Sequence, residues 1–303
     1  MPATILPRTG IRKPSAGQNP NFTDIDFTLQ TIDDLSTWKV PAGATEATCV
    51  AAIAACHAAG GGVVEFMGLA YAVAGAVAFN VSLPTVSLKF QQGCVISYTG
   101  SGVCLRVRMT PFTIANAGTV SGGVTIDGTG AAPGAVGIEA GCVIGFGWDG
   151  VSVQNFSAAG SVNWDFNNAT ANSWMERCRF TRCSSANGKV DYRFRCVATS
   201  TSFLYNDFAD LRFNVVGGQI AFQTISPAQL IDVQLNLRGN VDGAGVIFDI
   251  QSGSEVTRPH CHIQIEQTNG TGAVVFNAGQ LQYPSGVIEI NGIPALGTDR
   301  TIA

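Results

Sequence analysis

The chain has 303 residues, of which only 13% are charged, and its formal net charge of −4 provides no general basic surface. This composition excludes a typical nucleic-acid-binding protein, which needs clustered Lys and Arg residues. The 36 glycines, together with many Val, Ile, Thr and Asn residues, favour numerous short strands over a helical protein.

The segment Met1–Lys13 lacks the apolar run of about 7 to 15 residues that a signal peptide requires. No apolar run reaches the roughly 18 residues of a membrane span. We therefore expect synthesis in a host cytoplasm without Sec export, and no membrane insertion. The nine cysteines form no CxxC pair, which predicts reduced thiols packed as small hydrophobes, with no disulfide framework, metal site or cofactor.

Residues 1–43 differ from the rest of the chain because prolines interrupt them and prevent any long regular element. These prolines are Pro2, Pro7, Pro14, Pro20 and Pro41. The segment is predicted to be an extended arm with at most one short strand, in TDIDFTLQTI (23–32). It is either a disordered tail or an arm that docks on another protein.

A short helix is predicted at about residues 45–59. Thr45 can serve as its N-cap, and Gly60 is the residue type expected just past a helix end. Apolar residues at helical spacing form one stripe, namely Val50, Ile53 and Ala54. The order helix, glycines, strand is the reverse of a phosphate-binding loop, which requires strand, glycines, helix. A nucleotide site is therefore excluded here.

Beyond Val63 the sequence becomes a series of short, alternating apolar runs that repeat. VTIDGT (124–129) aligns with VSVQNF (151–156) at a spacing of 27 residues, and AVGIEA (135–140) aligns with SVNWDF (161–166) at 26. The runs IAFQT, VIFDI and VVFNA recur at positions 220, 246 and 274. Repeats of this length without helices between them indicate stacked coils of β-structure.

A second set of repeats is more irregular. MERCRFTRC (175–183) aligns with FADLRFNVV (208–216) at a spacing of 33, and DLRFNVVG (210–217) aligns with DVQLNLRG (232–239) at 22, continued by HIQIE (262–266). This register predicts inward stacks Leu211/Val233/Ile263 and Phe213/Leu235/Ile265, outward residues Arg212/Gln234/Gln264, and a ladder of Asn214 over Asn236.

These repeats predict an all-β protein, a single-stranded right-handed parallel β-helix of about eight to nine coils over residues 44–303, preceded by the capping helix and the arm. The alternative is a β-sandwich, whose hairpins would use two-residue DG or NG turns. Both dipeptides occur several times, so this alternative stays open from the sequence.

The stretch ATEATCVAAIAACHAAGGGVVEFMGLAYAV (44–73) resembles the start of pectate-lyase-like β-helix proteins. In that family an Ala-rich helix precedes GGG, a strand and a turn usually written PxGxY, here MGLAY. The resemblance implies that the helix covers the open end of the solenoid and shields its β edge. The family includes polysaccharide lyases and hydrolases, and also bacteriophage tailspikes and tail fibres, which are usually homotrimers.

The absence of a signal peptide and the Pro-rich arm resemble the phage branch. The expected protein is a phage virion component of the tailspike or tail-fibre type: a homotrimer that joins other virion proteins through residues 1–43 and attaches to a host cell-surface glycan. The alternatives are a polysaccharide depolymerase, hydrolase or lyase, and a head-decorating spike with a purely structural role. No sequence motif decides whether the protein is an enzyme.

A catalytic site on a β-helix would consist of carboxylates in successive coils, about 5 Å apart. The register above places Asp210 and Asp232 in one column with His262 next, and Asp207 and Glu176 nearby. Asp210, Asp232 and Glu176 are therefore the candidate catalytic residues. The alternative is that Asp at the start of a strand only caps a turn.

Three tryptophans lie close to acidic residues, and aromatic rings stack well on sugars. The candidate glycan-binding residues are Trp148, Asp149, Trp164, Asp165 and Trp174. The alternative, which we favour, is that these tryptophans fill the core or a subunit interface. His260, Cys261, His262 and Glu266 suggest a metal site only superficially, because no ligand from another coil is evident.

Overall fold

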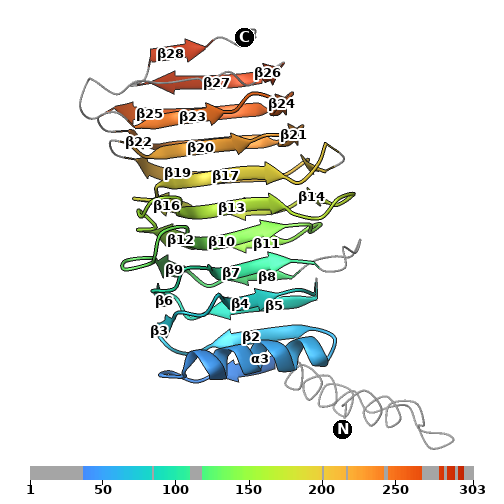
Figure 1. The fold of residues 1–303 in the computed structure, drawn as a ribbon, viewed down its shortest axis with the longest axis vertical. Helices are drawn as coiled ribbons and strands as arrows, with labels where there is room; N and C mark the ends of the chain where they lie inside the picture. Colours follow the sequence, from blue (N-terminus) through green and yellow to red (C-terminus); the bar gives the residue numbers. More distant parts are fainter. Residues whose placement is uncertain are drawn as a thin grey trace, which may run out of the picture.

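The computed structural model describes residues 37–83, 85–109, 118–199, 201–215, 218–241, 245–267, 280–282, 285–290 and 293–296. These residues form a right-handed parallel β-helix, in which each strand pairs with its counterpart one turn later (Figure 1). All pairings between named strands are parallel except β27 with β28. The predicted fold is therefore confirmed, and the β-sandwich alternative does not apply.

Sheet A contains 16 strands. One row consists of β1 (Thr37–Val40), β2 (Gly62–Phe66), β5 (Val86–Phe90), β8 (Thr119–Ser121), β11 (Gly147–Asp149) and β15 (Arg179–Thr181). A second row consists of β3 (Ala70–Val73), β6 (Val95–Tyr98), β9 (Val124–Asp127), β12 (Val151–Gln154) and β16 (Ser184–Ala186). The rows join at β19 (Asp207–Val215), followed by β22 (Gln234–Val241), β25 (His260–Gln267), β27 (Ser285–Ile290) and β28 (Ile293–Leu296).

Two further sheets complete the solenoid, and sheet C contributes strands only from Trp174 onward. Sheet B has seven strands, β4 (Val77–Val81), β7 (Val103–Arg108), β10 (Val136–Gly141), β13 (Val162–Asn168), β17 (Val190–Cys196), β20 (Ile220–Ile225) and β23 (Val246–Ile250). Sheet C has five, β14 (Trp174–Glu176), β18 (Ser202–Leu204), β21 (Gln229–Ile231), β24 (Glu255–Thr257) and β26 (Gln280–Gln282).

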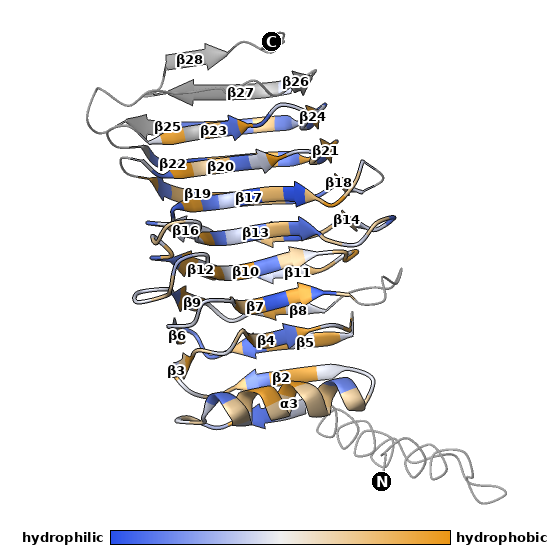
Figure 2. Cartoon of the chain, in the orientation of Figure 1, coloured by the Kyte–Doolittle hydropathy of each residue, from blue (hydrophilic) through white to orange (hydrophobic). Residues whose placement is uncertain are grey.

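The core is a stack of side chains that runs along the solenoid axis. Hydrophobic and hydrophilic residues follow one another along the strands in Figure 2, as expected when alternate side chains face inward. Aromatic rings stack between adjacent turns, with ring centroids 4.5 Å apart for Phe166 and Phe194 and 4.7 Å apart for Phe194 and Phe222. No turn could bury these rings alone, so stability depends on stacking.

The helix α3 (Glu46–Ala58) confirms the predicted cap. Thr45 is the N-cap and accepts a hydrogen bond from the Thr48 amide, while Gly60 has the left-handed φ of +87°. Of the predicted stripe, Ile53 is buried, whereas Val50 and Ala54 are exposed; Cys49 and Cys56 complete the buried face. Small cysteines let the helix lie close to β1, β2, β3 and β4.

Glu46 fastens α3 to the solenoid. Its carboxylate accepts hydrogen bonds from the backbone amides of Ala74 and Gly75, both at 2.9 Å. We expect Glu46→Ala to loosen the cap, because two charge-assisted bonds stabilise it by about 1.5–3 kcal/mol each. Labelling of Cys49 and Cys56 by a thiol reagent, followed by mass spectrometry, should accelerate about tenfold or more.

The control for this prediction is Glu65→Ala, which removes a carboxylate that pairs with the exposed Lys89 on the surface of β2 and β5. Equal labelling of the two variants would contradict the role of Glu46.

A hydrogen bond between Gly68 and Tyr71 explains why Gly and Tyr occur together in the MGLAY turn. The Tyr71 hydroxyl accepts from the amide of Gly68 at 2.7 Å. A Cβ atom on Gly68 would lie 2.9 Å from the Tyr71 hydroxyl and 3.0 Å from Cα of Ala42. Glycine is therefore required for close approach, and the spacing of Gly and Tyr in this turn is structural.

A polar cluster is buried where the chain passes from sheet A to sheet B. Asn163 donates from Nδ2 to Ser185 Oγ at 2.7 Å and to Asp191 Oδ1 at 3.0 Å, and the Gly188 amide also donates to Asp191 Oδ1. Burial raises the pKa of Asp191 to about 7, although hydrogen bonds from Ser185 and Gly188 act in the opposite direction. The cluster thus links β13, β16 and β17 through one titratable group.

The strand register confirms one set of predicted repeats and corrects the other. Val124 pairs with Val151, and Val136 with Val162, as expected. Leu211 pairs instead with Leu237, which pairs with Ile263, so this spacing is 26 and the predicted 22 is wrong. The stacks Leu211/Val233/Ile263 and Phe213/Leu235/Ile265 and the ladder of Asn214 over Asn236 do not form; Asn214 pairs with Asn240.

The predicted spacing of 33 is wrong as well, because Phe180 pairs with Phe208 at a spacing of 28. The strand β1, inside the segment expected to be the arm, pairs in parallel with β2. The described solenoid therefore includes Thr37–Val40, and the rest of the predicted arm before Thr37, including TDIDFTLQTI, lies outside the described residues. Among the described residues, no helix is long and apolar enough to cross a membrane.

Candidate functional site

The predicted carboxylate column does not form. Asp210 lies in β19 at a register irregularity between Phe208 and Leu211. Asp232 precedes β22 in a left-handed turn with φ +52°, and His262 pairs with Asn236. Asp210 and Asp232 therefore do not occupy equal positions, because the true spacing differs by four residues from the predicted one. The Asp232 carboxylate is bound to Arg258 through two hydrogen bonds of 2.7 Å.

Asp232 belongs instead to a ridge between sheets C and A. Arg177, Tyr205, Asp232 and Arg258 occupy the same left-handed turn in successive coils, with φ between +51° and +52°. The amide of each of the first three donates to a carbonyl in the next coil, at Leu204, Ile231 and Thr257 respectively. Tyr205 is 54% exposed. The ridge carries an aromatic ring and charges of both signs.

The other predicted carboxylates lie close to this ridge. Glu176 forms an ion pair with Arg177 at 3.2 Å and accepts a hydrogen bond from the Trp174 indole at 3.0 Å. Asp207 lies 3.6 Å from Arg179. Each of these carboxylates has a basic or indole partner, an arrangement that resembles a surface network more than a general acid and base.

The tryptophans fall into two groups. Trp148 is 1% exposed and Trp164 0% exposed, and their rings pack edge to face in the core with centroids 5.4 Å apart. Neither can stack on a sugar, so the geometry corrects their candidacy as glycan-binding residues and supports the alternative of core packing. Trp174 is partly exposed, and its role stays a prediction.

His260 and His262 both point outward from β25, between the buried Cys261 and Ile263. His260 Nδ1 lies 3.1 Å from Ser285 Oγ. The described residues contain no group of three His, Cys, Asp or Glu side chains placed to hold a metal ion. The side chain of Glu266 is outside the described part.

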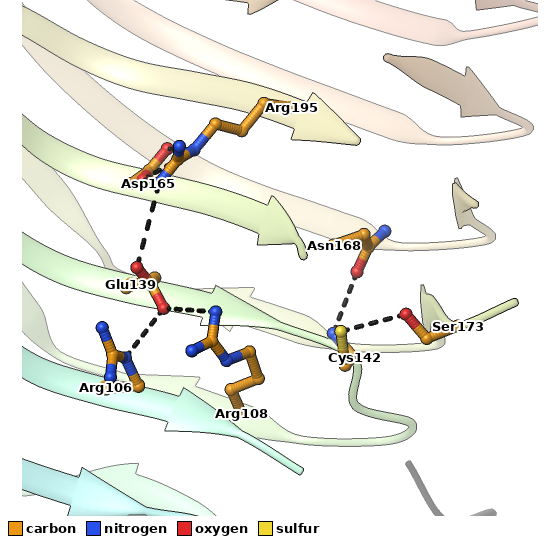
Figure 3. A network of polar contacts seen from close by, with 8 residues as sticks. All are labelled: Arg106, Arg108, Glu139, Cys142, Asp165, Asn168, Ser173 and Arg195. Atoms are coloured by element: carbon orange, nitrogen blue, oxygen red, sulfur yellow. Dashed lines mark hydrogen bonds and ion pairs between the residues drawn. The ribbon is translucent and has the colours of Figure 1, made fainter. Parts of the chain in front are cut away.

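The strongest cluster of functional side chains lies on the outward face of sheet B. Strand pairing aligns Arg106, Glu139, Asp165 and Arg193 across β7, β10, β13 and β17. Arg108 and Arg195 lie two residues further along their strands (Figure 3). We call these six residues the arginine face.

The two acids of the arginine face are buried and bound. Glu139 is 4% exposed, and its Oε1 accepts from Arg106 Nε at 2.8 Å and lies 3.0 Å from Arg108 Nη1. Asp165 is 0% exposed and accepts from Arg193 Nε at 2.9 Å and from Arg195 Nη2 at 2.5 Å. Buried carboxylates are tolerated only when they are paired and hydrogen-bonded. The fold can therefore bury Glu139 and Asp165 only because the arginines bind them.

The arginines in turn have more hydrogen-bonding capacity than the acids can use. Four guanidinium groups present about twenty N–H donors, while two carboxylates accept about eight hydrogen bonds. Four positive charges face two negative ones. The arginine side chains remain between 17% and 37% exposed. The surplus donors and charge are therefore available at the surface, held in place by the buried acids.

A second network at the end of β10 and β13 fixes the backbone beside the arginine face. Asn168 Oδ1 accepts from the Cys142 amide at 2.9 Å (Figure 3). Asn168 Nδ2 donates to the Ser202 carbonyl at 2.7 Å. Cys142 Sγ lies 3.0 Å from Ser173 Oγ. These contacts link three coils and rigidify the strand ends that carry Glu139 and Asp165.

Of the six residues of the arginine face, only Asp165 is among the residues predicted from the sequence, as a candidate glycan-binding residue beside the tryptophans. The signal is the alternation of charged and apolar residues in VCLRVR (103–108), VGIEAG (136–141), VNWDFNN (162–168) and VDYRFRC (190–196). Each segment shows only one to three charged residues. Their convergence is evident only once strands 26 to 33 residues apart are placed in register.

Comparisons with known proteins assign no family to the chain. No protein-family model and no curated protein sequence matches the chain. Among solved structures it is similar to the Azotobacter vinelandii mannuronan C-5 epimerase AlgE6 A-module, with a TM-score of 0.32 and 14% identity, over 82% of this chain and 90% of that chain. The fold assignment rests on the strand pairing described above.

Proposed function

We propose that the protein is a virion component of the tailspike or tail-fibre type that attaches to an anionic cell-surface glycan through the arginine face. The observation that carries the binding proposal is the surplus of positive charge and N–H donors held by two buried carboxylates. Guanidinium groups bind carboxylate and phosphate oxygens with good geometry. Glu139 and Asp165 already restrain the arginine side chains, so these side chains lose less conformational entropy when a ligand binds.

The layout of the arginine face suits a chain more than a compact ligand. Arg106 and Arg108 lie on β7, and Arg193 and Arg195 lie on β17, three strand spacings away. At about 4.8 Å per spacing, the two pairs are roughly 14 Å apart along the solenoid axis. A polymer with repeated anionic groups could contact both pairs at once.

The virion assignment rests on the resemblance of residues 44–73 to pectate-lyase-like β-helix proteins, which include phage tailspikes, and on the Pro-rich arm. In this proposal the arm joins other virion proteins, and the chain assembles as a homotrimer. A solenoid suits a rigid projection, because every turn is stacked on the next through a continuous core.

Binding is preferred over depolymerisation because of the state of the carboxylates. Glu139 and Asp165 are both hydrogen-bonded to guanidinium groups, whereas a glycosidase needs one carboxyl group free to give a proton and another free to attack or activate water. Release of reducing ends or unsaturated sugars from a bound polysaccharide would favour the enzymatic alternative.

The test compares an acidic and a neutral polymer, polygalacturonate and dextran, by biolayer interferometry. We expect binding to polygalacturonate only, weakened by added salt. Arg108→Gln should lower this affinity about tenfold, with little effect on folding because Glu139 keeps Arg106. The matched control is Arg238→Gln, an exposed arginine of β22 on sheet A. Equal binding of both polymers, or equal losses in both variants, would overturn the proposal.

A further inference from the structure

A cavity of about 490 Å³ lies at the bend of sheet A, away from the arginine face. The chain bends between β8 and β9, and again between β11 and β12. From β19 onward one continuous strand replaces the bend, since β19 pairs with both β15 and β16. The cavity is lined by Phe90, Gln92, Gly122, Gly123, Asp149, Gly150 and Arg182.

Glycines keep this bend hollow. Gly122, Gly123 and Gly150 have φ values of +109°, +76° and +68°, a region that favours glycine. A Cβ atom on Gly122 would lie 1.8 Å from the Phe90 carbonyl oxygen, so no side chain fits there. The wall on this side of the cavity is therefore made of backbone.

An ion pair forms one end of the cavity. Asp149 and Gly150 are aligned with Thr181 and Arg182 in the next turn. Arg182 has the left-handed φ of +53°, and its guanidinium binds both oxygens of Asp149, with Nη2 2.7 Å from Oδ1 and 2.6 Å from Oδ2. This pairing orients the carboxylate and the guanidinium beside the glycine wall.

The chemistry of the lining selects a class of ligand. Gln92 offers a donor and an acceptor, Asp149 only acceptors, and Arg182 only donors, and the charges of the pair cancel. Hydroxyl groups, which both donate and accept, complement such a mixture. The volume lies within the range of about 300–1,000 Å³ typical of small-ligand sites. An anion would gain no net attraction from the neutral Asp149–Arg182 pair, and an apolar ligand would leave the polar groups unpaired.

We propose that this corner cavity binds a neutral sugar unit through its hydroxyl groups, using Asp149, Arg182 and Gln92. The site goes beyond the proposed function, because it lies on another sheet and recognises uncharged rather than anionic groups. Of the predicted glycan-binding residues, Asp149 is the one it employs.

The proposal is tested with a substitution whose side chain fills the cavity and whose backbone conformation the fold tolerates. Gly123→Asn is suitable because asparagine tolerates the left-handed conformation, which Asn155, Asn172 and Asn187 already adopt in this chain. Its Cβ would meet Gln92 Cγ at 3.5 Å, an ordinary contact, and its amide would occupy the cavity. The matched control is Gly134→Asn, at φ +81° with open space around the Cβ.

Saturation-transfer NMR is measured with glucose, galactose, rhamnose, N-acetylglucosamine and maltose as probes. We expect transfer to at least one of them from the full chain and from Gly134→Asn, reduced about tenfold in Gly123→Asn. Binding of polygalacturonate should be unchanged in Gly123→Asn, which separates this site from the arginine face. No transfer from any probe, or equal transfer in the two variants, would overturn the proposal.

Discussion

Replacement of Asp191 by asparagine is expected to remove most of the pH dependence of the free energy of unfolding between about pH 4 and pH 7. Burial raises the pKa of Asp191 to about 7 from an ordinary value of 3.8. The folded state therefore binds this proton more tightly than the unfolded state does. Protonation of Asp191 therefore stabilises the folded state fully below about pH 4, and this contribution to the free energy of unfolding is lost as the pH rises through about 7.

The size of this effect follows from the shift of about three pKa units, which corresponds to roughly 4 kcal/mol. Wild-type protein should lose up to that amount between about pH 4 and pH 8, whereas Asp191→Asn should stay nearly constant and become the more stable of the two at about pH 8. Chemical denaturation followed by circular dichroism at several pH values measures both curves.

The control is Asp232→Asn, because Arg258 holds the pKa of the partly exposed Asp232 below its ordinary value. This variant should keep the wild-type decline between about pH 4 and pH 7. A decline in Asp191→Asn as steep as in wild type would show that another group is responsible.

The second large effect is expected from Arg195→Met, which should lower the free energy of unfolding by about 2–4 kcal/mol. Asp165 is fully buried, and Arg195 supplies three of its contacts, at 3.1, 3.0 and 2.5 Å. Methionine replaces the aliphatic part of the arginine side chain, so the loss mainly reports the partly uncompensated carboxylate. The midpoint of urea unfolding measures it.

A double-mutant cycle isolates the pair. Asp165→Asn removes the buried charge, so adding Arg195→Met to it should cost about 2 kcal/mol less than Arg195→Met alone. Arg238→Met on sheet A is the control for loss of an exposed arginine and should change stability by less than about 0.5 kcal/mol. Additive effects of the two substitutions would mean that Asp165 does not depend on Arg195.

Local signals in the sequence were sufficient for the cap and the fold class. The N-cap Thr45 and the glycine after the helix depend on nearest neighbours, and both are observed. The repeats at 26 and 27 residues also agree with the strand pairing. The arm that precedes Thr37 and its partners stay a prediction.

The register of the later coils could not be obtained in the same way. Shifting DLRFNVVG against DVQLNLRG by four residues leaves every side chain on the same face, because the strand period is two. The apolar pattern therefore fits spacings of 22 and 26 equally well, and the matching Asp and Asn letters favoured the wrong one. The wrong spacing of 22 placed Asp210 and Asp232 in one column. With that spacing the sequence did not show that Tyr205 and Asp232 occupy the same turn in successive coils.

The arginine face could not be predicted from the sequence for another reason. A net charge of −4 says nothing about how charges are distributed, and strand pairing brings four arginines together on one face of sheet B. The preference of tryptophan for sugars was likewise outweighed by burial, because a ring of that size gains more in the core of a turn than at its surface.

All nine cysteines are free and buried, and burial raises the pKa of thiols such as Cys49 to about 11 and Cys261 to about 12. Thiols in this state are almost entirely uncharged near neutral pH and are shielded from oxidants. The solenoid thus needs no covalent crosslink to form, and it has no exposed thiol among these nine to be altered afterwards. A chain folded under reducing conditions can keep the same structure under oxidising ones, with no enzyme to assist the transition.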